Sequence, residues 1–155
     1  HAWMARGACP LRTGGCRSAL WEYRGLGWLP RAPVDLEPVE LWVDERDRVW
    51  LLGRDAYGSE RSSVAVLTDG EWTRVAAPSS FGQVRMVGRS ATEVWFFDAA
   101  HLFVSDGAVI REVSTPLERI ESLWVEPTGP LWIGGTERDG DAERGAVYRL
   151  TGAPR

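Results

Sequence analysis

The sequence predicts an all-β protein built from one repeated unit of short antiparallel strands, and three observations favour this class. Short apolar runs recur along the chain and are separated by turns rich in Gly, Asp and Pro. Within 41–53, two such runs flank a charged turn, and Trp42 and Trp50 lie eight residues apart. The same interval separates Val87 from Trp95 and Trp124 from Trp132. A register that recurs three times is typical of a repeat protein.

The first unit is predicted to contain three strands in up-and-down order. We expect them at 1–7, 18–24 and 28–33. The first of these, HAWMARG, resembles VWLLGRD at 49–55, with an aromatic anchor followed by short apolar residues and an arginine. Prolines in the third run fit an edge strand, because proline has no N–H to donate to a β-ladder.

The second unit is complete and shows the size of the repeat. Four strands are expected, at 39–43, 49–53, 63–67 and 72–76. Asp69-Gly70 predicts a tight hairpin between the last two, because both residues tolerate positive φ. Four antiparallel strands in roughly 40 residues correspond to one blade of a β-propeller.

The remaining units follow the same plan. The third has strands at 84–87, 94–97, 101–104 and 109–113, and the fourth has strands at 122–125, 131–134 and 146–150, with a polar loop at 136–144. The prediction is therefore a β-propeller segment of about four blades, of three, four, four and three strands, at 1–35, 36–81, 82–117 and 118–155.

Because the first blade lacks its innermost strand and the last its outermost, we expect a larger ring, completed by further sequence or by another chain. Exposed edges or an extensive partner are then expected at Trp3 and at 147–150.

The variation in repeat length predicts where ligands bind. The outer-strand anchor precedes the next second-strand tryptophan by 22 residues (28 to 50), 23 (72 to 95) and 22 (110 to 132). Since this separation is nearly constant, the differences in repeat length must lie in the segment between the second and third strands. Loops that vary in length in this way commonly form a binding face. The candidate binding residues on these loops, which we expect to share one rim with the loop between Cys9 and Cys16, are Arg54, Asp55, Tyr57, Arg138, Asp139 and Asp141.

Six of the nine tryptophans occupy equivalent positions of the repeat. We expect their main role to be packing between neighbouring blades. They are Trp3, Trp42, Trp50, Trp95, Trp124 and Trp132.

The segment Glu126-Pro-Thr-Gly-Pro-Leu-Trp-Ile-Gly134 resembles a run that is typical of tryptophan-rich propeller repeats in bacterial secreted proteins, including the two-component regulator propellers. That run reads D-x-x-G-x-[LV]-W-[IV]-G, and this segment has Glu in place of Asp. The segment from Asp44 to Trp50 lacks the turn glycine, and in the segment from Gly88 to Trp95 the glycine is displaced. The resemblance implies a β-propeller fold and carries no specific activity.

Charge and composition exclude several classes of function. The net charge is −4, and no basic stripe of the kind that binds phosphates occurs, so nucleic acid is not an expected partner. No apolar run reaches the roughly 18 residues of a membrane span. We expect no cofactor.

Two cysteines, Cys9 and Cys16, are separated by six residues. A disulfide is the favoured interpretation, which predicts a secreted, periplasmic or cell-surface protein. The alternative is two free thiols in a cytosolic protein, because the spacing is not the CxxC of redox and zinc sites.

Two groups of residues are candidate metal ligands. Asp139, Asp141 and Glu143 alternate as in calcium loops, but Arg144 and Leu150 stand where such a loop has Gly and Glu, so a solvated loop is favoured. His1 and His101 are the only histidines and would suit copper, although His101 fits a strand residue near a turn.

Catalytic motifs such as GxSxG and the phosphate-binding loop are absent from the sequence. The sequence therefore favours a non-enzymatic module. Such a module binds a protein or a polar ligand such as a carbohydrate, or forms a subunit of a larger assembly. The alternative is a propeller-type carbohydrate-active enzyme, a lyase or glycosidase, with carboxylates around the ring axis.

Overall fold

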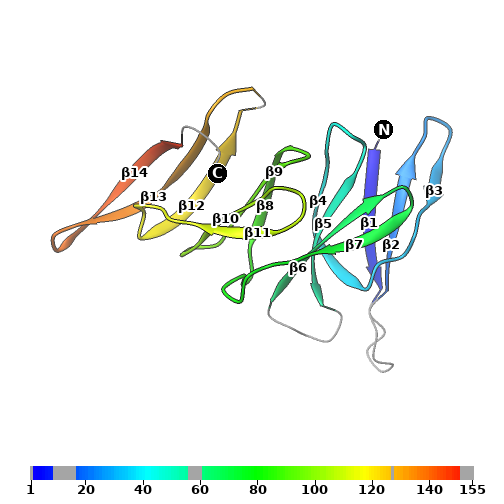
Figure 1. Ribbon diagram of the computed structural model, residues 1–155, viewed down its shortest axis with the longest axis horizontal. Coiled ribbons are helices and arrows are strands. Elements are labelled where there is room, and N and C mark those ends of the chain that lie inside the picture. The colour runs from blue at the N-terminus through cyan, green and yellow to red at the C-terminus, as the bar shows by residue number, and fades with distance from the viewer. Residues whose placement is uncertain (1, 9–16, 56–60, 127, 151–155) are drawn as a thin grey trace.

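The computed structural model describes residues 2–8, 17–55, 61–126 and 128–150, and these form fourteen β-strands in four antiparallel sheets (Figure 1). The strands are β1 (Ala2–Ala8), β2 (Arg17–Tyr23), β3 (Trp28–Pro30), β4 (Leu36–Val43), β5 (Val49–Asp55), β6 (Ser62–Thr68), β7 (Glu71–Val75), β8 (Arg85–Ser90), β9 (Glu93–Phe97), β10 (Leu102–Ser105), β11 (Ile110–Val113), β12 (Arg119–Val125), β13 (Leu131–Asp139) and β14 (Ala142–Leu150).

Each sheet is a simple meander in which every strand pairs with its neighbour in the sequence. Sheet 1 has the order β1-β2-β3, sheet 2 β4-β5-β6-β7, sheet 3 β8-β9-β10-β11 and sheet 4 β12-β13-β14. The all-β class and the predicted strand numbers of three, four, four and three are confirmed. The eight-residue interval arises because Trp42 pairs with Trp50, Val87 with Trp95 and Trp124 with Trp132.

The predicted loop at 136–144 is wrong, because these residues extend the β13–β14 hairpin. The pairs Thr136–Gly145, Glu137–Arg144, Arg138–Glu143 and Asp139–Ala142 continue the ladder. Oppositely charged side chains face each other across it, and the Arg144 guanidinium lies 2.6 Å from the Glu137 carboxylate. Cross-strand charge pairs of this kind stabilise a two-stranded ribbon. The polar composition of 136–144 therefore belongs to a charged ribbon and not to a loop.

The Asp69-Gly70 hairpin forms as predicted. Asp69 has φ of 52° and Gly70 has φ of 89°, so the two central residues of the β6–β7 turn are both left-handed. This turn type matches the right-handed twist of the strands that it joins.

The four sheets follow one another in a row, with sheet 1 at the right and sheet 4 at the left of Figure 1. The first strands of the last three sheets form one side of this row, since β4 contacts β8 and β8 contacts β12. The first strand of sheet 1, β1, likewise contacts the first strand of sheet 2, β4. The described strands therefore form an open row, with sheets 1 and 4 at opposite ends.

Apolar side chains between successive sheets form the core. The largest cluster joins Trp50 and Leu52 of sheet 2 to Phe96 and Phe103 of sheet 3, and Phe81, from the connection between the two sheets, is packed among them. A second cluster joins sheet 3 to sheet 4, and two smaller ones join sheet 1 to sheet 2. Each sheet is thus stabilised mainly by burial against its neighbours.

The tryptophans follow this order of sheets. Trp50 and Trp95 are fully buried, each against the sheet that follows, and Trp3 is half-buried against sheet 2. The predicted packing of Trp124 between blades does not occur within the described residues, where Trp124 is 59% exposed. Trp42, its equivalent in sheet 2, is covered by sheet 3, whereas no described sheet follows sheet 4.

The described residues form strands, turns and irregular segments, and they contain no helix that is long and apolar enough to span a membrane.

Candidate functional site

Acidic residues at the hairpin turns hold the tryptophans of the second strands. The Asp44 carboxylate accepts hydrogen bonds from the Trp50 indole N–H at 3.0 Å, from the Arg48 guanidinium at 2.8 Å and from two backbone N–H groups of the turn. Glu126 takes the same place in sheet 4, where its carboxylate lies 3.3 Å from the indole nitrogen of Trp132. These acids therefore have a structural role in the repeat.

Burial raises the pKa of Asp44, but the hydrogen bonds from Trp50 and from the residues of the turn outweigh it and hold the pKa below its ordinary value. The carboxylate is therefore ionised at neutral pH. Because its hydrogen bonds stabilise the charged form, Asp44 is a poor candidate for a general acid.

The turns of successive sheets are joined to one another by polar contacts. Arg48 donates to the carbonyl oxygen of Ala91 at 2.5 Å, and the Ala91 N–H donates to the Glu45 carboxylate at 2.9 Å. Arg89 of sheet 3 donates to the Gly129 carbonyl of sheet 4 at 2.6 Å. These contacts fix the spacing of the turns along one side of the row.

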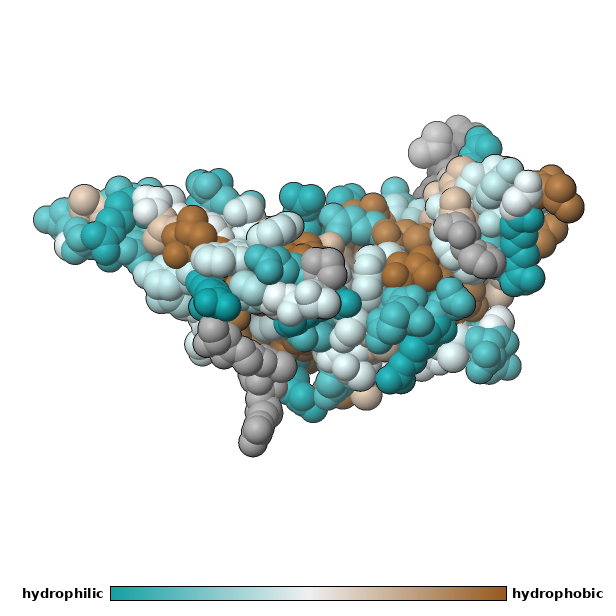
Figure 2. Space-filling view, turned by 90° about the horizontal axis from the view of Figure 1, so that it is seen from above, coloured by the Kyte–Doolittle hydropathy of each residue, from teal (hydrophilic) through white to brown (hydrophobic). Residues whose placement is uncertain are grey.

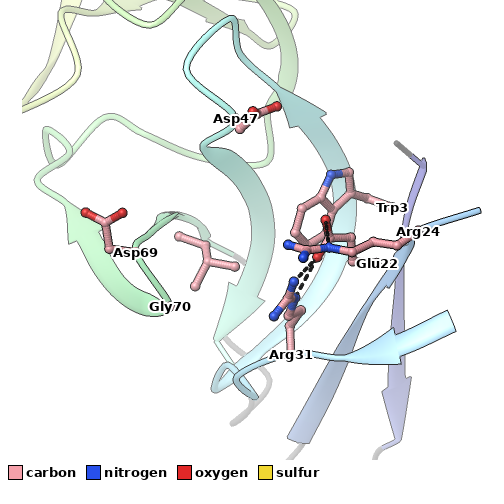
Figure 3. A pocket seen from close by; sticks show the side chains of 8 residues that line it. Trp3, Glu22, Arg24, Arg31, Asp47, Asp69 and Gly70 are labelled. Atoms are coloured by element: carbon pink, nitrogen blue, oxygen red, sulfur yellow. Dashed lines mark hydrogen bonds and ion pairs between the residues drawn. The ribbon is translucent and has the colours of Figure 1, made fainter.

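A polar pocket of about 260 Å³ lies where sheet 1 meets the turns of sheet 2 (Figure 3). Sheet 1 and the segment after β3 contribute Trp3, Glu22, Arg24 and Arg31, and sheet 2 contributes Asp47, Leu67, Asp69 and Gly70. In Figure 3 the two arginine side chains converge on the Glu22 carboxylate beside the Trp3 ring, and Asp47 and Asp69 stand on separate turns.

Glu22 is the buried charge of this pocket. Its carboxylate accepts from Nε of Arg24 at 2.8 Å and from Nε of Arg31 at 2.7 Å. The hydrogen bond from Arg24 and the charge and hydrogen bonds of Arg31 hold the pKa of Glu22 below its usual value, against the opposing effect of burial. Glu22 is thus an anion that orients two arginines whose side chains remain partly exposed.

The pocket offers charges of both signs to a ligand. Partly exposed guanidinium groups bind carboxylates and phosphates well, because their planar donors match two oxygens at once. The carboxylates of Asp47 and Asp69 belong to exposed residues and are available to a cationic group. The arrangement suits a polar ligand or a protein loop that carries both charges.

A second hollow, of about 400 Å³, contains one of the predicted binding residues. Asp55, at the end of β5, accepts from Arg74 at 3.1 Å and from the Ser63 hydroxyl at 3.2 Å. Arg54, another predicted residue, is exposed and pairs with Ser62 in the ladder between β5 and β6. Arg61 donates to the carbonyl oxygens of Pro78 and Ser79, at the boundary between sheets 2 and 3.

The other predicted binding residues lie far from this hollow. Arg138, Asp139 and Asp141 are exposed at the tip of the β13–β14 hairpin, at the opposite end of the row from sheet 1 (Figure 1). Arg138 pairs with Glu118 at 2.9 Å, and Asp139 pairs with Arg144 at 3.2 Å. The predicted residues that the structure describes therefore lie in two separate regions.

Some predictions concern residues that lie outside the described ranges, namely Tyr57, His1 and the proposed disulfide between Cys9 and Cys16. His101 has its ring nitrogen 3.1 Å from the Asp98 carboxylate and stacks on Phe103. Among the residues that the structure describes, no three His, Cys, Asp or Glu side chains lie together as a metal site, so Asp139, Asp141 and Glu143 do not form one.

Sequence reasoning missed the pocket residues Glu22, Arg24 and Arg31. Glu22 and Arg24 are two positions apart, which places them on one face of a strand, and this was the only local signal. Arg31 comes from the segment after β3, and Asp47 and Asp69 come from another sheet. Only the packing of sheet 1 on sheet 2 brings them together.

Comparison of the chain with protein-family models, with curated proteins and with solved structures finds no match. The likeness to propeller repeats therefore stays a prediction from the motif.

Proposed function

We propose that this chain is a non-enzymatic module of the β-propeller type that acts outside the cytoplasm, binds a protein or a polar ligand, and assembles through the faces of its terminal sheets. One observation carries the proposal. Trp124 occupies the position of Trp42 in the repeat, yet Trp42 is covered by the next sheet and Trp124 is 59% exposed.

The terminal sheet exposes more than this one aromatic ring. Val147, on the same face of sheet 4, is 71% exposed. Arg149, paired with Trp132, is the exposed charge on this otherwise apolar part of the face. Exposed apolar residues that gather on one face commonly mark an interaction site. The face therefore supports an assembly in which a further β-sheet covers sheet 4 as sheet 3 covers sheet 2.

A carboxylate on the first strand of sheet 2 has a structural role, which favours a binding module over the alternative of a carbohydrate-active enzyme. A glycosidase needs two carboxylates that flank a substrate in an open cleft. Glu40, on the inner strand β4, instead accepts the backbone N–H of Met86 on β8 at 2.6 Å and lies 3.4 Å from Arg85. Its carboxylate holds two sheets together.

The assembly is tested with Trp124→Glu and Val147→Glu. We expect both variants to keep the circular dichroism spectrum of the wild type and to lose association, because a charge on this face opposes burial. Where the wild type is monomeric, an apolar dye should bind its open face and should bind neither variant. Val39→Glu is a matched control, since Val39 is exposed on β4 but lies on neither terminal face. Unchanged association and dye binding in both terminal variants would contradict the proposal.

The location outside the cytoplasm rests on the predicted Cys9–Cys16 disulfide. Alkylation of the native protein with and without a reductant, followed by mass spectrometry, tests it. We expect modification only after reduction, whereas two freely alkylated thiols would contradict the location.

A further inference from the structure

Each sheet has two distinct faces, which we name by their neighbours. The forward face packs on the following sheet and carries the second-strand tryptophan, as Trp50 does in sheet 2 and Trp95 in sheet 3. The backward face packs on the preceding sheet and carries the residue after that tryptophan, as Phe96 and Ile133 do. Every interface within the chain thus joins a forward face to a backward face.

Two faces have no partner among the described residues, and they are of opposite kinds. One is the backward face of sheet 1, where Met4 on the edge strand β1 follows Trp3 as Leu51 follows Trp50 on β5. Met4 is 42% exposed, whereas Leu51 is 1% exposed and Ile133 is fully buried. The other is the forward face of sheet 4, which carries Trp124, Trp132 and Val147.

The backward face of sheet 1 is mainly aromatic and apolar, and the exposed Arg6 lies toward one end of it. The strand register places Met4 beside Trp21 and Pro30, and places Tyr23 beside Trp28. The rings of Tyr23 and Trp28 are 5.4 Å apart, and both residues are exposed. In Figure 2 hydrophobic residues reach the surface at the right-hand end of the molecule, where sheet 1 lies, and again toward the left, over sheet 4.

We infer that a second copy of this chain packs head to tail on the first, with the backward face of its sheet 1 against the forward face of sheet 4. This inference rests on the proposed function and names its partner. Two such contacts join two copies into one closed ring of eight sheets, which lies within the usual range of four to eight blades. A contact between a forward face and a backward face is heterologous, because it joins two different surfaces. Copies that associate in this way either close into a ring or continue to add as an open filament.

Like-with-like pairing fits the structure less well. An isologous dimer through sheet 4 would place Trp124 against Trp124 and would leave the face with Met4, Tyr23 and Trp28 in water. The head-to-tail contact covers both unpartnered faces and repeats the polarity of the three interfaces inside the chain.

The test is complementation between two variants of the full chain. We expect the wild type to have twice the mass of one chain by light scattering, and Met4→Glu and Trp124→Glu each to raise the dissociation constant by about thirtyfold or more, as loss of an interface hot spot does. In a ring of two copies of the same variant, both contacts between the copies contain the introduced glutamate. An equimolar mixture regains one unaltered contact, so it should form dimers at concentrations at which neither variant does.

Val39→Glu should leave the mass at the wild-type value. Three outcomes would overturn the inference: a wild-type monomer at high concentration, dissociation by Trp124→Glu alone without complementation, or an open ladder of growing oligomers. In the first case, retained dye binding that Trp124→Glu removes would leave the proposed function standing, with a partner other than a second copy.

Discussion

The indole ring of Trp42 on β4 occupies the space that a Cβ atom at Gly88 on β8 would fill. This contact joins the first strands of two successive sheets, and Trp42 also packs against the largest apolar cluster of the protein. A glycine is required at 88 because the ring lies directly on the backbone.

Gly88→Ala should therefore destabilise the protein by about 1–3 kcal/mol, the usual cost of overpacking. Urea denaturation measures the change. Gly145→Ala is the control, because a Cβ there meets nothing within 4 Å. Trp42→Leu should relieve much of the cost in the double variant, since residues in contact couple energetically. Wild-type stability of Gly88→Ala would show that the contact is not formed.

Asp44→Ala should lower the free energy of unfolding, because it leaves the buried Trp50 indole N–H without its acceptor. An unsatisfied buried donor costs about 1–3 kcal/mol. Asp35→Ala, at an exposed position without positive φ, gives the comparison for a surface carboxylate. The denaturation midpoint measures both, and equal midpoints for the two variants would refute the structural role of Asp44.

The lowered pKa of Asp44 predicts how this stabilisation depends on pH. The contribution is complete above the ordinary value of 3.8 and is lost as the pH falls through the lower pKa of the folded state. Asp44→Asn removes the titrating group, so the stability difference between the wild type and this variant should shrink as the medium is acidified below pH 3.8. A difference that grows with acidification would contradict the assigned shift.

Phe81→Ala should be one of the most destabilising substitutions in the protein. The ring is buried and meets Phe96 and Phe103 edge-on, with centroids 5.4 and 5.2 Å away. Removing it leaves a cavity between sheets 2 and 3, at a cost of about 3–5 kcal/mol. Leu26→Ala, at a fully exposed turn position, should change stability by less than about 0.5 kcal/mol. Calorimetry or denaturant titration separates the two outcomes.

The β13–β14 hairpin should contain a tyrosine with a raised pKa. The Tyr148 hydroxyl donates to the Glu137 carboxylate, and this hydrogen bond, together with burial and the negative charge, raises the pKa of Tyr148. Glu137→Gln should move one step of the ultraviolet tyrosine titration toward lower pH, and Tyr148→Phe should remove that step. An unaltered titration in Glu137→Gln would show that the hydrogen bond between Tyr148 and Glu137 is not formed.

Local patterns were sufficient to predict the strands. Short apolar runs and turn residues such as Asp69-Gly70 act through neighbouring backbone geometry, so the fourteen strands and their meander order could be predicted from the sequence. The β13–β14 hairpin is the exception. Its charges suggested a loop, but the cross-strand pairs that stabilise it become visible only when Glu137 and Arg144 are in register.

The candidate site could be predicted only in part. Asp55 was identified from a loop of variable length, and it does line a hollow. Its partner Arg74, nineteen residues further along the chain, was not predicted. The buried Glu22 and its two arginines were missed as well, because their proximity depends on strand register and on the packing of sheet 2.

By itself, the sequence determined the all-β class, the repeat and the positions of the tryptophans, since each of these follows from side-chain periodicity and turn chemistry over a few residues. The tertiary structure decided which faces are covered. Trp42 and Trp124 occupy equivalent positions, yet one lies on Gly88 and the other is exposed to solvent. Burial depends on what packs against a face, and that neighbour comes from a distant part of the chain or from another molecule.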